Sequence, residues 1–430
     1  MRAHWLLSLL VAGSSLGIGC ASQDSGDGVD DQDFLDGKAD GATTQNVMHT
    51  GLSANVTTLK ATATIDLEHN GNVALEVGGL TITKVMDDNG ARVRNYKVTN
   101  GKLRVSLVRS PLTVEYSFTG HDMADGLLPG GSTVIWPYFC GNLFPCHSQP
   151  ADGTTFSLEL TGVPAGKTAV YPEAIDSQAP PYMLAWAVGS YTHADLGTTD
   201  AGTKIGVYWL PNGESPARKG TKNLTKVVDW YEKTLGPYSF GPEMNSVSVV
   251  WGEGLYGGME HHPDFHVARD AMGDEVTHAH EAAHGWFGDG IRLQCWEDFL
   301  LSEGTVSYLS ARALSVVDPS LEAGIWAEYQ SELTDAEHDG GAPAWPTGCN
   351  QIDIIKDKLF TNLPYMEGAF FYKEVAEHVG ADKLDAVLSK FYNAHVGKPA
   401  RMQQMVDLIK SETGYDPKEI VTRRLRKHFP

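Results

Sequence analysis

Basic residues are scarce in this chain: 33 lysines and arginines stand against 54 aspartates and glutamates, which gives a formal net charge of −21. A surface of this sign repels phosphate backbones, so nucleic acid is excluded as a favoured partner. Solubility, or the attraction of cationic ligands, fits the charge better. With 42% hydrophobic and 20% charged residues, the 430-residue chain has the composition of a soluble globular protein with two or more domains.

Long apolar runs are also missing, except at the N-terminus. The run from Trp5 to Ile18 follows a short basic start and is too short to cross a bilayer, so residues 1–20 are predicted to be an export signal. The run ends at Cys20 in a segment that resembles a bacterial lipobox, although Gly17 stands where that motif usually has leucine. We therefore expect either a lipoprotein that contacts the membrane through Cys20 or a free periplasmic or extracellular protein released by ordinary signal cleavage.

Cysteine is rare and no Cys-x-x-Cys is present, which argues against zinc binding through paired thiolates. Lipidation of Cys20 leaves four cysteines, for which three pairings are possible. Disulfides are expected outside a reducing cytosol. Cys140 and Cys146 enclose a short loop and are the favoured pair, which leaves Cys295 with Cys349.

No internal repeat of fixed period occurs. The residue composition and hydrophobic pattern change twice along the chain. Residues 21–44 hold seven aspartates among glycine, serine and alanine, so they are predicted to form an acidic disordered tether; a calcium loop is disfavoured because the EF-hand spacing is missing. Residues 45–195 alternate with period two between turn signals, which predicts an N-terminal antiparallel β-sheet domain.

Residues 196–430 are rich in helical patterns and are predicted to form a mainly α domain with a buried strand at 245–251. The fold class is therefore α+β. The expected helices span 223–235, 274–287, 297–316, 366–379, 382–395, 401–413 and 417–428.

The central chemical motif is His280-Glu281-Ala282-Ala283-His284. Two histidines four residues apart share one helix face and can bind a single ion. Zinc takes a third protein ligand and keeps one position for water, and Glu303 on a second predicted helix is the candidate. Glu281 follows the first ligand directly and can act as general base toward the water that the zinc activates. These residues predict one zinc ion per chain.

Four spaced motifs resemble those of peptidase family M1, the alanyl-aminopeptidase type of gluzincin that includes leukotriene hydrolase. They occur in the family's order and lie at Gly257–His261, His280–Gly288, Trp296–Gly304 and Pro364–Ala369. The resemblance extends over roughly residues 45 to 428. It implies a thermolysin-like catalytic domain and a zinc-dependent aminopeptidase that hydrolyses the N-terminal peptide bond of short peptides with a free N-terminus.

Carried over residue by residue, the resemblance implies His280, His284 and Glu303 as zinc ligands and Glu281 as general base. It also implies that the hydroxyl of Tyr365 donates a hydrogen bond to the oxyanion of the tetrahedral intermediate.

The segment Gly257-Gly258-Met259-Glu260 resembles the family's exopeptidase motif, in which the glutamate binds the α-ammonium of the substrate. The two glycines have no side chain, so their backbone can approach a peptide closely. Asp298 either orients a ligand histidine or caps a helix. The remaining nearby histidines are interpreted as loop or packing residues: His261, His262, His266 and His278.

The chain departs from the family at several positions. His261 and Ser302 each replace an asparagine, and Trp136 stands where a glutamine or glutamate usually helps to hold the substrate amine. The family's C-terminal helical domain is not matched, so a more open site is expected. Two alternatives to an aminopeptidase are therefore kept: a zinc endopeptidase of broader specificity, and a non-catalytic metal-binding protein of the same fold.

Overall fold

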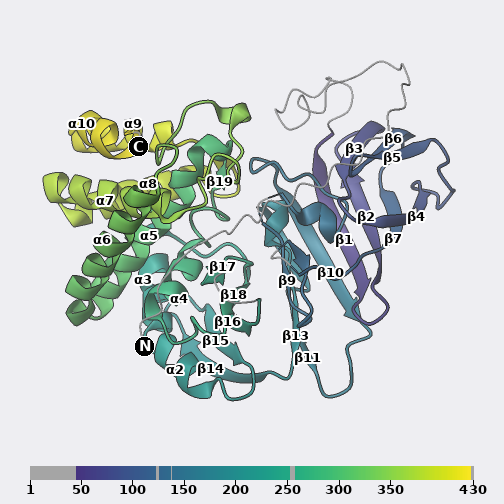
Figure 1. Cartoon of the computed structure of the whole chain (residues 1–430), viewed down its shortest axis with the longest axis horizontal. Coiled ribbons are helices and arrows are strands. Elements are labelled where there is room, and N and C mark those ends of the chain that lie inside the picture. Colours follow the sequence, from purple (N-terminus) through teal and green to yellow (C-terminus); the bar gives the residue numbers. More distant parts are fainter. Residues whose placement is uncertain (1–44, 123–124, 137, 252–256, 428–430) are drawn as a thin grey trace.

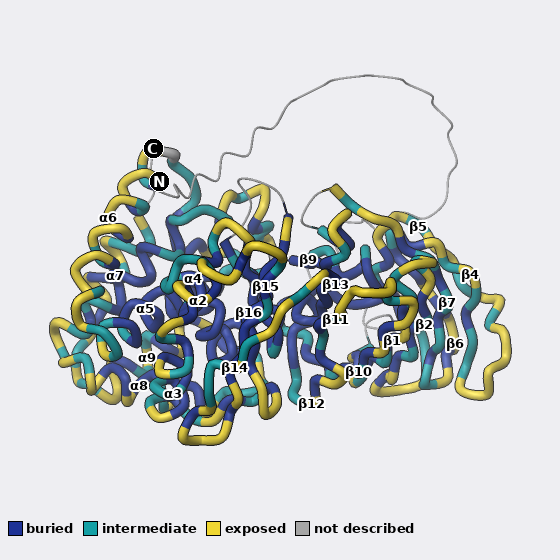
Figure 2. Tube along the Cα trace, turned by 90° about the horizontal axis from the view of Figure 1, so that it is seen from below, coloured by how far each residue is buried: buried dark blue, intermediate teal, exposed yellow. Residues whose placement is uncertain are grey.

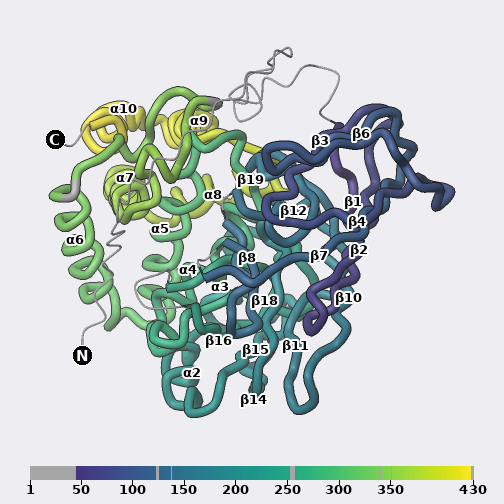
Figure 3. The backbone as a smooth tube through the Cα atoms, turned by 45° about the vertical axis from the view of Figure 1, so that its right-hand side comes forward, coloured from purple at the N-terminus to yellow at the C-terminus, as the bar shows by residue number. Residues whose placement is uncertain are grey.

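The computed structural model describes residues 45–122, 125–136, 138–251 and 257–427. The expected export signal with Cys20, and the acidic tether, lie outside the described residues. Figures 1 and 3 show a β domain placed along one side of a helix-rich domain, which confirms the α+β class. Within the described part, no helix combines the length and the hydropathy needed to span a membrane.

The N-terminal domain is built on a six-stranded sheet in the order β12-β10-β1-β2-β7-β4. Every neighbouring pair is antiparallel except β1 and β10, which run parallel, so the prediction of a mostly antiparallel sheet is correct. The period-two pattern has the expected cause: alternate residues of β2, such as Ala63 and Ile65, are fully buried. The strands of this sheet are β1 (Val47–Asn55), β2 (Lys60–Leu67), β4 (Thr81–Met86), β7 (Leu112–Ser117), β10 (Thr154–Thr161) and β12 (Ala174–Ala179).

Smaller sheets complete this domain. They are β3 (Gly71–Glu76), β6 (Lys102–Val108) and β5 (Tyr96–Thr99) in that spatial order; β8 (Gly126–Leu127) with β9 (Thr133–Val134); and β11 (Thr168–Val170) with β13 (Ala187–Gly189).

The segment after β9 carries Trp136 and leads into the disulfide between Cys140 and Cys146. The second disulfide joins Cys295 to Cys349 in the catalytic domain, so the favoured pairing is the one observed.

The second domain contains a five-stranded sheet in the order β14-β15-β16-β18-β17, of which the sequence predicted at least one strand, at 245–251. β16 is buried along nearly its whole length, as expected; of the strands that were missed, β14 is largely solvent-exposed and β17 has two residues. The expected boundary at 195 falls inside β14, whose pairing with β15 assigns it to the second sheet. The bounds are β14 (Thr192–Thr198), β15 (Lys204–Trp209), β16 (Glu243–Val249), β17 (Gly258–Met259) and β18 (Asp264–Ala268).

Helices form the rest of this domain, and Figure 2 shows their exposed outer faces and buried inner faces. Six of the predicted helices are present with ends shifted by a few residues, while α2 and α6 were missed. The helix expected at 417–428 is instead a short α-helical turn, Lys418–Ile420, followed by a π-helical turn, Val421–Leu425. The missed helix α6 buries Ile325, Tyr329, Leu333 and Ala336, a helical spacing that the sequence did contain. The helices are α2 (Glu214–Gly220), α3 (Leu224–Leu235), α4 (Glu275–Ala283), α5 (Phe299–Val317), α6 (Glu322–Asp339), α7 (Asn362–Val379), α8 (Ala381–His395), α9 (Met402–Thr413) and α10 (Lys418–Ile420).

Helices α5 and α7 cross at two glycines. A Cβ atom on Gly304 would lie 2.7 Å from the Cα of Gly368, and a Cβ on Gly368 would lie 2.4 Å from the Cα of Gly304. The two backbones are therefore in direct contact, and no side chain fits between them. This contact places the residues just before each glycine, which include Glu303 on α5 and Tyr365 on α7, at one site.

Arg292 joins the two domains. It lies on the short strand β19 (Arg292–Leu293), which pairs with β20 (Pro399–Ala400). Its buried guanidinium donates hydrogen bonds to the carbonyl oxygens of Ala151 and Gln178 in the β domain and of Gly397 in the catalytic domain. A single charged group thus satisfies carbonyls from both sides of the junction.

Candidate active site

Three side-chain atoms converge between α4 and α5. Nε2 of His280 and Nε2 of His284 are 3.3 Å apart, and Oε2 of Glu303 lies 3.2 and 3.4 Å from them. Zinc bonds of about 2.0–2.1 Å in tetrahedral geometry separate neighbouring ligand atoms by about 3.3 Å. The predicted ligands are therefore brought together at the spacing of three corners of a zinc tetrahedron.

The other ring nitrogen of each histidine is held by a neighbour. Nδ1 of His284 lies 3.0 Å from the carbonyl oxygen of Phe287 and 3.3 Å from the hydroxyl of Ser302. Nδ1 of His280 lies 3.5 Å from the hydroxyl of Ser307. Because a carbonyl only accepts, Nδ1 of His284 carries the proton and Nε2 keeps its lone pair for an ion.

The sequence did not assign these two serines a role at the metal site. Gly288 explains how Ser302 comes so close: its φ is +109°, and a Cβ there would lie 2.5 Å from the Ser302 hydroxyl and 2.6 Å from Nδ1 of His284. The glycine after the Trp-Phe pair therefore leaves space for the contact between Ser302 and His284. Ser307 stands one helical turn after Glu303, which is the signal that would have identified it.

Asp298 does not orient a ligand histidine, so that expectation was wrong. Its Oδ1 accepts a hydrogen bond from the backbone N–H of Met402 at 2.9 Å, at the first residue of α9. It caps a helix, as the alternative proposed, but a distant one, since its side chain makes no cap bond to α5. Burial raises the pKa of Asp298 to about 6.

Glu281 lies buried on α4, facing strand β17. Its backbone carbonyl accepts a hydrogen bond from Nε2 of His262 at 2.8 Å, and Nδ1 of the same ring lies 2.8 Å from the hydroxyl of Tyr238. Burial raises the pKa of the Glu281 carboxyl well above its usual value. The neutral ring of His262 thus holds the backbone of the helical turn that carries Glu281, the expected base.

Glu260 follows β17 and is only 4% exposed, and its Oε1 has no hydrogen-bond partner among the described residues. One of its oxygens lies within 4.8 Å of a carboxylate oxygen of Glu281 and a ring nitrogen of His284. Burial raises the pKa of Glu260 to about 7. A buried carboxylate oxygen without a partner is costly, so this geometry indicates a cationic ligand at Oε1.

Asp289 adds another buried carboxylate that the sequence reasoning missed. It is fully buried, and neither of its oxygens has a hydrogen-bond partner within standard distance among the described residues. Burial, followed by the charge of Glu260, raises its pKa well above the usual range. Four buried carboxylates therefore surround two histidines, and this excess of negative charge fits a divalent cation at the three donors.

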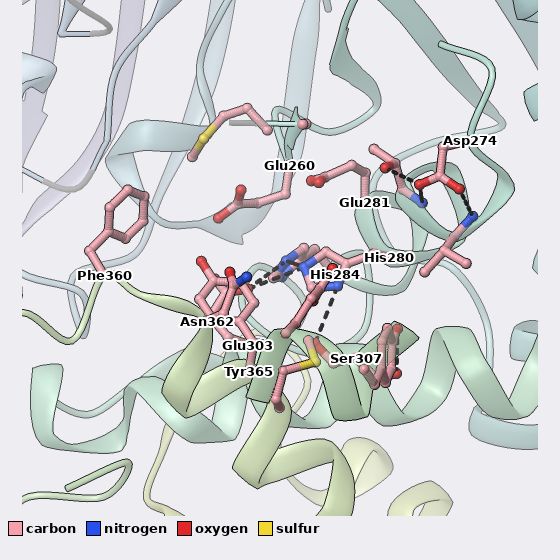
Figure 4. A pocket seen from close by; sticks show the side chains of 18 of the residues that line it. Glu260, Asp274, His280, Glu281, His284, Glu303, Ser307, Phe360, Asn362 and Tyr365 are labelled. Atoms are coloured by element: carbon pink, nitrogen blue, oxygen red, sulfur yellow. Dashed lines mark hydrogen bonds and ion pairs between the residues drawn. The ribbon is translucent and has the colours of Figure 1, made fainter. Parts of the chain in front are cut away.

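Tyr365 lies on α7 beside the metal ligands. Its ring stacks on His280 with 5.9 Å between centroids and 15° between planes, and it meets Phe299 edge-on at 5.8 Å. Figure 4 shows Tyr365 next to Glu303 and the histidines. The structure thus brings Tyr365 to the site, as the motif implied.

One cavity joins these residues. Its volume is about 940 Å³, part of which is open to solvent. Trp136, which the motif comparison sets in place of an amine-binding amide or carboxylate, reaches the cavity from the β domain and packs on Phe360 at 4.2 Å between ring centroids. The cavity is lined by Trp136, Gly257, Gly258, Met259, Glu260, Asp274, Val276, Thr277, His280, Glu281, His284, Glu303, Ser307, Glu328, Tyr329, Glu332, Phe360, Thr361, Asn362, Tyr365 and Met366.

The other histidines near the motif are packing residues, as expected. The rings of His261 and His266 contact each other at 5.0 Å, and His278 lies between the hydroxyl of Ser246 and the carbonyl of Met272. Burial lowers the pKa of each of these three histidines, which favours the neutral ring. Within the described residues, none of them joins a group of possible metal ligands.

Comparison with known proteins agrees with this geometry. The chain is 24% identical to aminopeptidase M1-B of Oryza sativa subsp. japonica over 313 residues, which cover 65% of this chain and 35% of that protein. It is 22% identical to human endoplasmic reticulum aminopeptidase 1 over 310 residues, covering 65% of this chain and 32% of that protein. The chain therefore spans about a third of the length of these curated relatives.

A solved structure covers much more of the chain. The M1 zinc metallopeptidase of Deinococcus radiodurans matches with a TM-score of 0.73 and 18% identity, over 89% of this chain and 94% of that one. A mutant of the same enzyme bound to a Tyr-Ser-Ala substrate matches with a TM-score of 0.74 and 18% identity, over 89% and 95%. Residues 261–424 match the model of the peptidase family M1 domain. The matched segment contains His280, His284, Glu303 and Tyr365, so the family-model match, the relatives and the shared fold all support assignment of the chain to peptidase family M1.

Proposed function

We propose that this protein is a zinc aminopeptidase that hydrolyses the N-terminal peptide bond of short peptides. The observation that carries the proposal is Glu260: a buried carboxylate with an unpartnered oxygen, in the same cavity as the three metal donors. A peptide's free α-ammonium is a cation of the right size and reach to pair with it. Several relatives are named as aminopeptidases, which supports the same activity.

The donor set fits one zinc ion, held by His280, His284 and Glu303. Zinc supplies a Lewis acid and lowers the pKa of water toward neutrality. The nitrogen and oxygen donors, their mutual distances and the surrounding carboxylates all favour this ion.

The protein's own groups divide the remaining work. Glu281 accepts the proton of the attacking water and returns it to the leaving amine. Its side chain is held between α4 and Gly258, so the carboxylate is positioned before substrate enters. Tyr365 donates a hydrogen bond to the oxyanion as negative charge develops there.

Glu260 sets where cleavage occurs. An ammonium bound to this carboxylate, close to the metal donors, leaves room for only one residue between the amine and the scissile carbonyl. Peptides with a blocked N-terminus lose this ion pair and leave Glu260 buried and unpaired. Selective cleavage of the first peptide bond follows.

An endopeptidase is the second candidate, because the indole of Trp136 has no oxygen that could accept a hydrogen bond from the substrate amine, and the cavity is partly open. One peptide prepared with a free and with an N-acetylated terminus separates the two with zinc-replete protein. An aminopeptidase cleaves the free form at least about 30-fold faster, given the typical loss when a buried charge is left unpaired. Equal rates favour the endopeptidase, and no cleavage of either form favours a non-catalytic zinc protein.

We also propose that the protein acts outside the cytoplasm, anchored through Cys20 or released. The two disulfides support an oxidising compartment. Fractionation of cells that express the full chain, with Cys20→Ala beside it, tests both ideas. Loss of membrane association in the variant supports anchoring, and recovery of both proteins in the cytosol rejects export.

A further inference from the structure

The cavity has two unlike ends. Phe360, on which Trp136 packs, lies on one side of the metal donors and Asp274 on the other; Glu328 and Glu332 line the same cavity, close enough to Asp274 for its charge to act on both. Figure 4 shows Phe360 and Asp274 on opposite sides of the histidines, with Glu260 and Glu281 between them. We call Asp274, Glu328 and Glu332 the acidic end of the cavity.

The acidic end is built from two helices. Asp274 is the N-terminal cap of α4, where its carboxylate accepts hydrogen bonds from the backbone of Val276 and Thr277. Glu328 and Glu332 are four residues apart on α6 and so share one helix face. No lysine or arginine is among the described residues that line the cavity.

These carboxylates have no cation of their own. Glu328 and Glu332 make no ion pair and no hydrogen bond with any residue that the structure describes, although both line the cavity. Burial, and then the charges of Glu328 and Asp274, raise the pKa of Glu332 to about 8. Like charges held this close repel one another, and a bound cation would relieve the repulsion.

A second carboxylate site in the same cavity fixes the direction of a ligand. The unpartnered oxygen of Glu260 is buried in the same cavity, and Figure 4 shows Glu281 between Glu260 and Asp274. In the proposed function the substrate's ammonium binds Glu260 and the scissile bond lies at the donors. The chain beyond that bond must then continue past Glu281 toward Asp274 (Figure 4).

We propose that the acidic end binds the cationic side chain of the residue that follows the scissile bond, so the preferred substrates are peptides with lysine or arginine in second position. This inference rests on the proposed function, because Glu260 sets the direction of the peptide. The long, flexible side chains of lysine and arginine carry their charge away from the backbone, toward Glu328 and Glu332.

The test compares two peptides of equal length, alanyl-lysine amide and alanyl-norleucine amide, which differ in the side-chain charge. With zinc-replete full-length protein we expect kcat/KM to be about tenfold higher for the lysine peptide. Raising the salt concentration from 50 to 500 mM should reduce this ratio, since a partly open site is screened. A ratio near one at low salt overturns the inference.

Glu328→Gln and Glu332→Gln, made singly and together, assign the preference to residues. The double variant should reduce the ratio to about one, and each single variant should reduce it in part. Glu322→Gln is the matched control, because it removes the same charge from the same helix outside the cavity. A ratio that stays at the wild-type value in the double variant overturns the assignment, as does an equal fall in the control.

Binding separates this inference from the proposed function. Calorimetry on zinc-loaded Glu281→Gln measures the dissociation constants of both peptides without turnover. A tenfold tighter Kd for the lysine peptide supports the acidic end even if the wild-type protein cleaves neither peptide. If the wild-type protein cleaves the norleucine peptide but both peptides bind equally well, the proposed aminopeptidase function stands. The proposed role of the acidic end in binding a cationic side chain is then rejected.

Discussion

Gly258 lies so close to Glu281 that a Cβ atom at position 258 would be 2.3 Å from Oε1 and 2.4 Å from Cγ of that glutamate. Strand β17 therefore has no side chain at the point where it meets the proposed base. Any substituent on this α-carbon must displace Glu281.

Gly258→Ala should therefore impair turnover without removing the metal. We expect kcat to fall by about 10² or more, because the contribution of a general base depends on its position, while zinc content stays at the wild-type value. Gly324→Ala is the control, since a Cβ on this glycine of α6 meets nothing within 4 Å. Zinc analysis and steady-state kinetics check the result; a variant with wild-type kcat would show that Glu281 does not need this space.

Glu281→Gln should keep zinc and lose catalysis. The amide preserves the shape of the side chain but cannot accept a proton, and we expect kcat to fall by about 10²–10⁴. Glu303→Gln should instead weaken zinc binding, because it removes a charged donor from the metal site. Metal content after dialysis distinguishes the two variants. Activity near wild type in Glu281→Gln would reject its role as base.

Glu260→Ala should reduce cleavage of peptides with a free amine selectively. Loss of a buried ion pair costs about 2–5 kcal/mol, so kcat/KM for these substrates should fall by about 30-fold or more. Cleavage of N-acetylated peptides, where measurable, should change little. The measurement is the ratio of the two rates before and after substitution, and a uniform fall in both would contradict amine binding by Glu260.

Gly304→Ala should destabilise the fold and the metal site together. The added methyl meets the backbone of Gly368, and overpacking of this kind costs about 1–3 kcal/mol. Because Glu303 is the adjacent residue, zinc affinity should fall as well. Gly368→Ala should have a similar effect, and the double variant should show non-additive losses because both methyls occupy one contact. Thermal unfolding and zinc titration measure the two effects, and additive losses would reject the shared contact.

Asp298 should make stability depend on pH. Burial raises its folded-state pKa to about 6, above its unfolded value, so the folded state favours the protonated form. Its contribution is fully present below the unfolded pKa, near 4, and is lost as pH rises through about 6. Asp298→Asn cannot ionise, so its stability relative to wild type should improve by about 1–3 kcal/mol between pH 4.5 and 7.5. Denaturant unfolding at several pH values measures the difference; a constant difference would reject this role.

Much of the site could be predicted from sequence because its proposed metal donors and base lie in short motifs whose residues are close together along the chain. The histidines at 280 and 284 share a helix face wherever that helix forms, and Glu303 required only one further helix. Residues whose roles depend on packing were not predictable in this way. Ser302 contacts His284 because Gly288 adopts a positive φ, and Asp298 caps α9 because that helix returns from a distant part of the chain.

The fold shows the same division. Strands such as β2 and β10 can be predicted from sequence because apolar and polar residues alternate along them, with one face of the strand buried and the other more exposed. The edge strand β14 is polar and β17 has only two residues, so neither has a pattern to detect, and both depend on pairing with neighbours in the catalytic sheet. Helix α6 was missed although its buried residues have helical spacing. As a result, the sequence analysis did not identify Glu328 and Glu332, which lie on this helix, as residues of the cavity.

Trp136 belongs to the β domain, yet its ring forms part of the wall of the catalytic cavity through its packing on Phe360. The helical half thus holds every group proposed for the chemistry but not the whole surface that receives the substrate. Rotation of one half against the other would separate these two rings and widen the entrance, and the Arg292 junction resists that rotation by binding carbonyls on both sides. The shape of the pocket therefore depends on how the two domains are joined. Substitutions at the junction around Arg292 should change substrate selectivity although they lie outside the pocket.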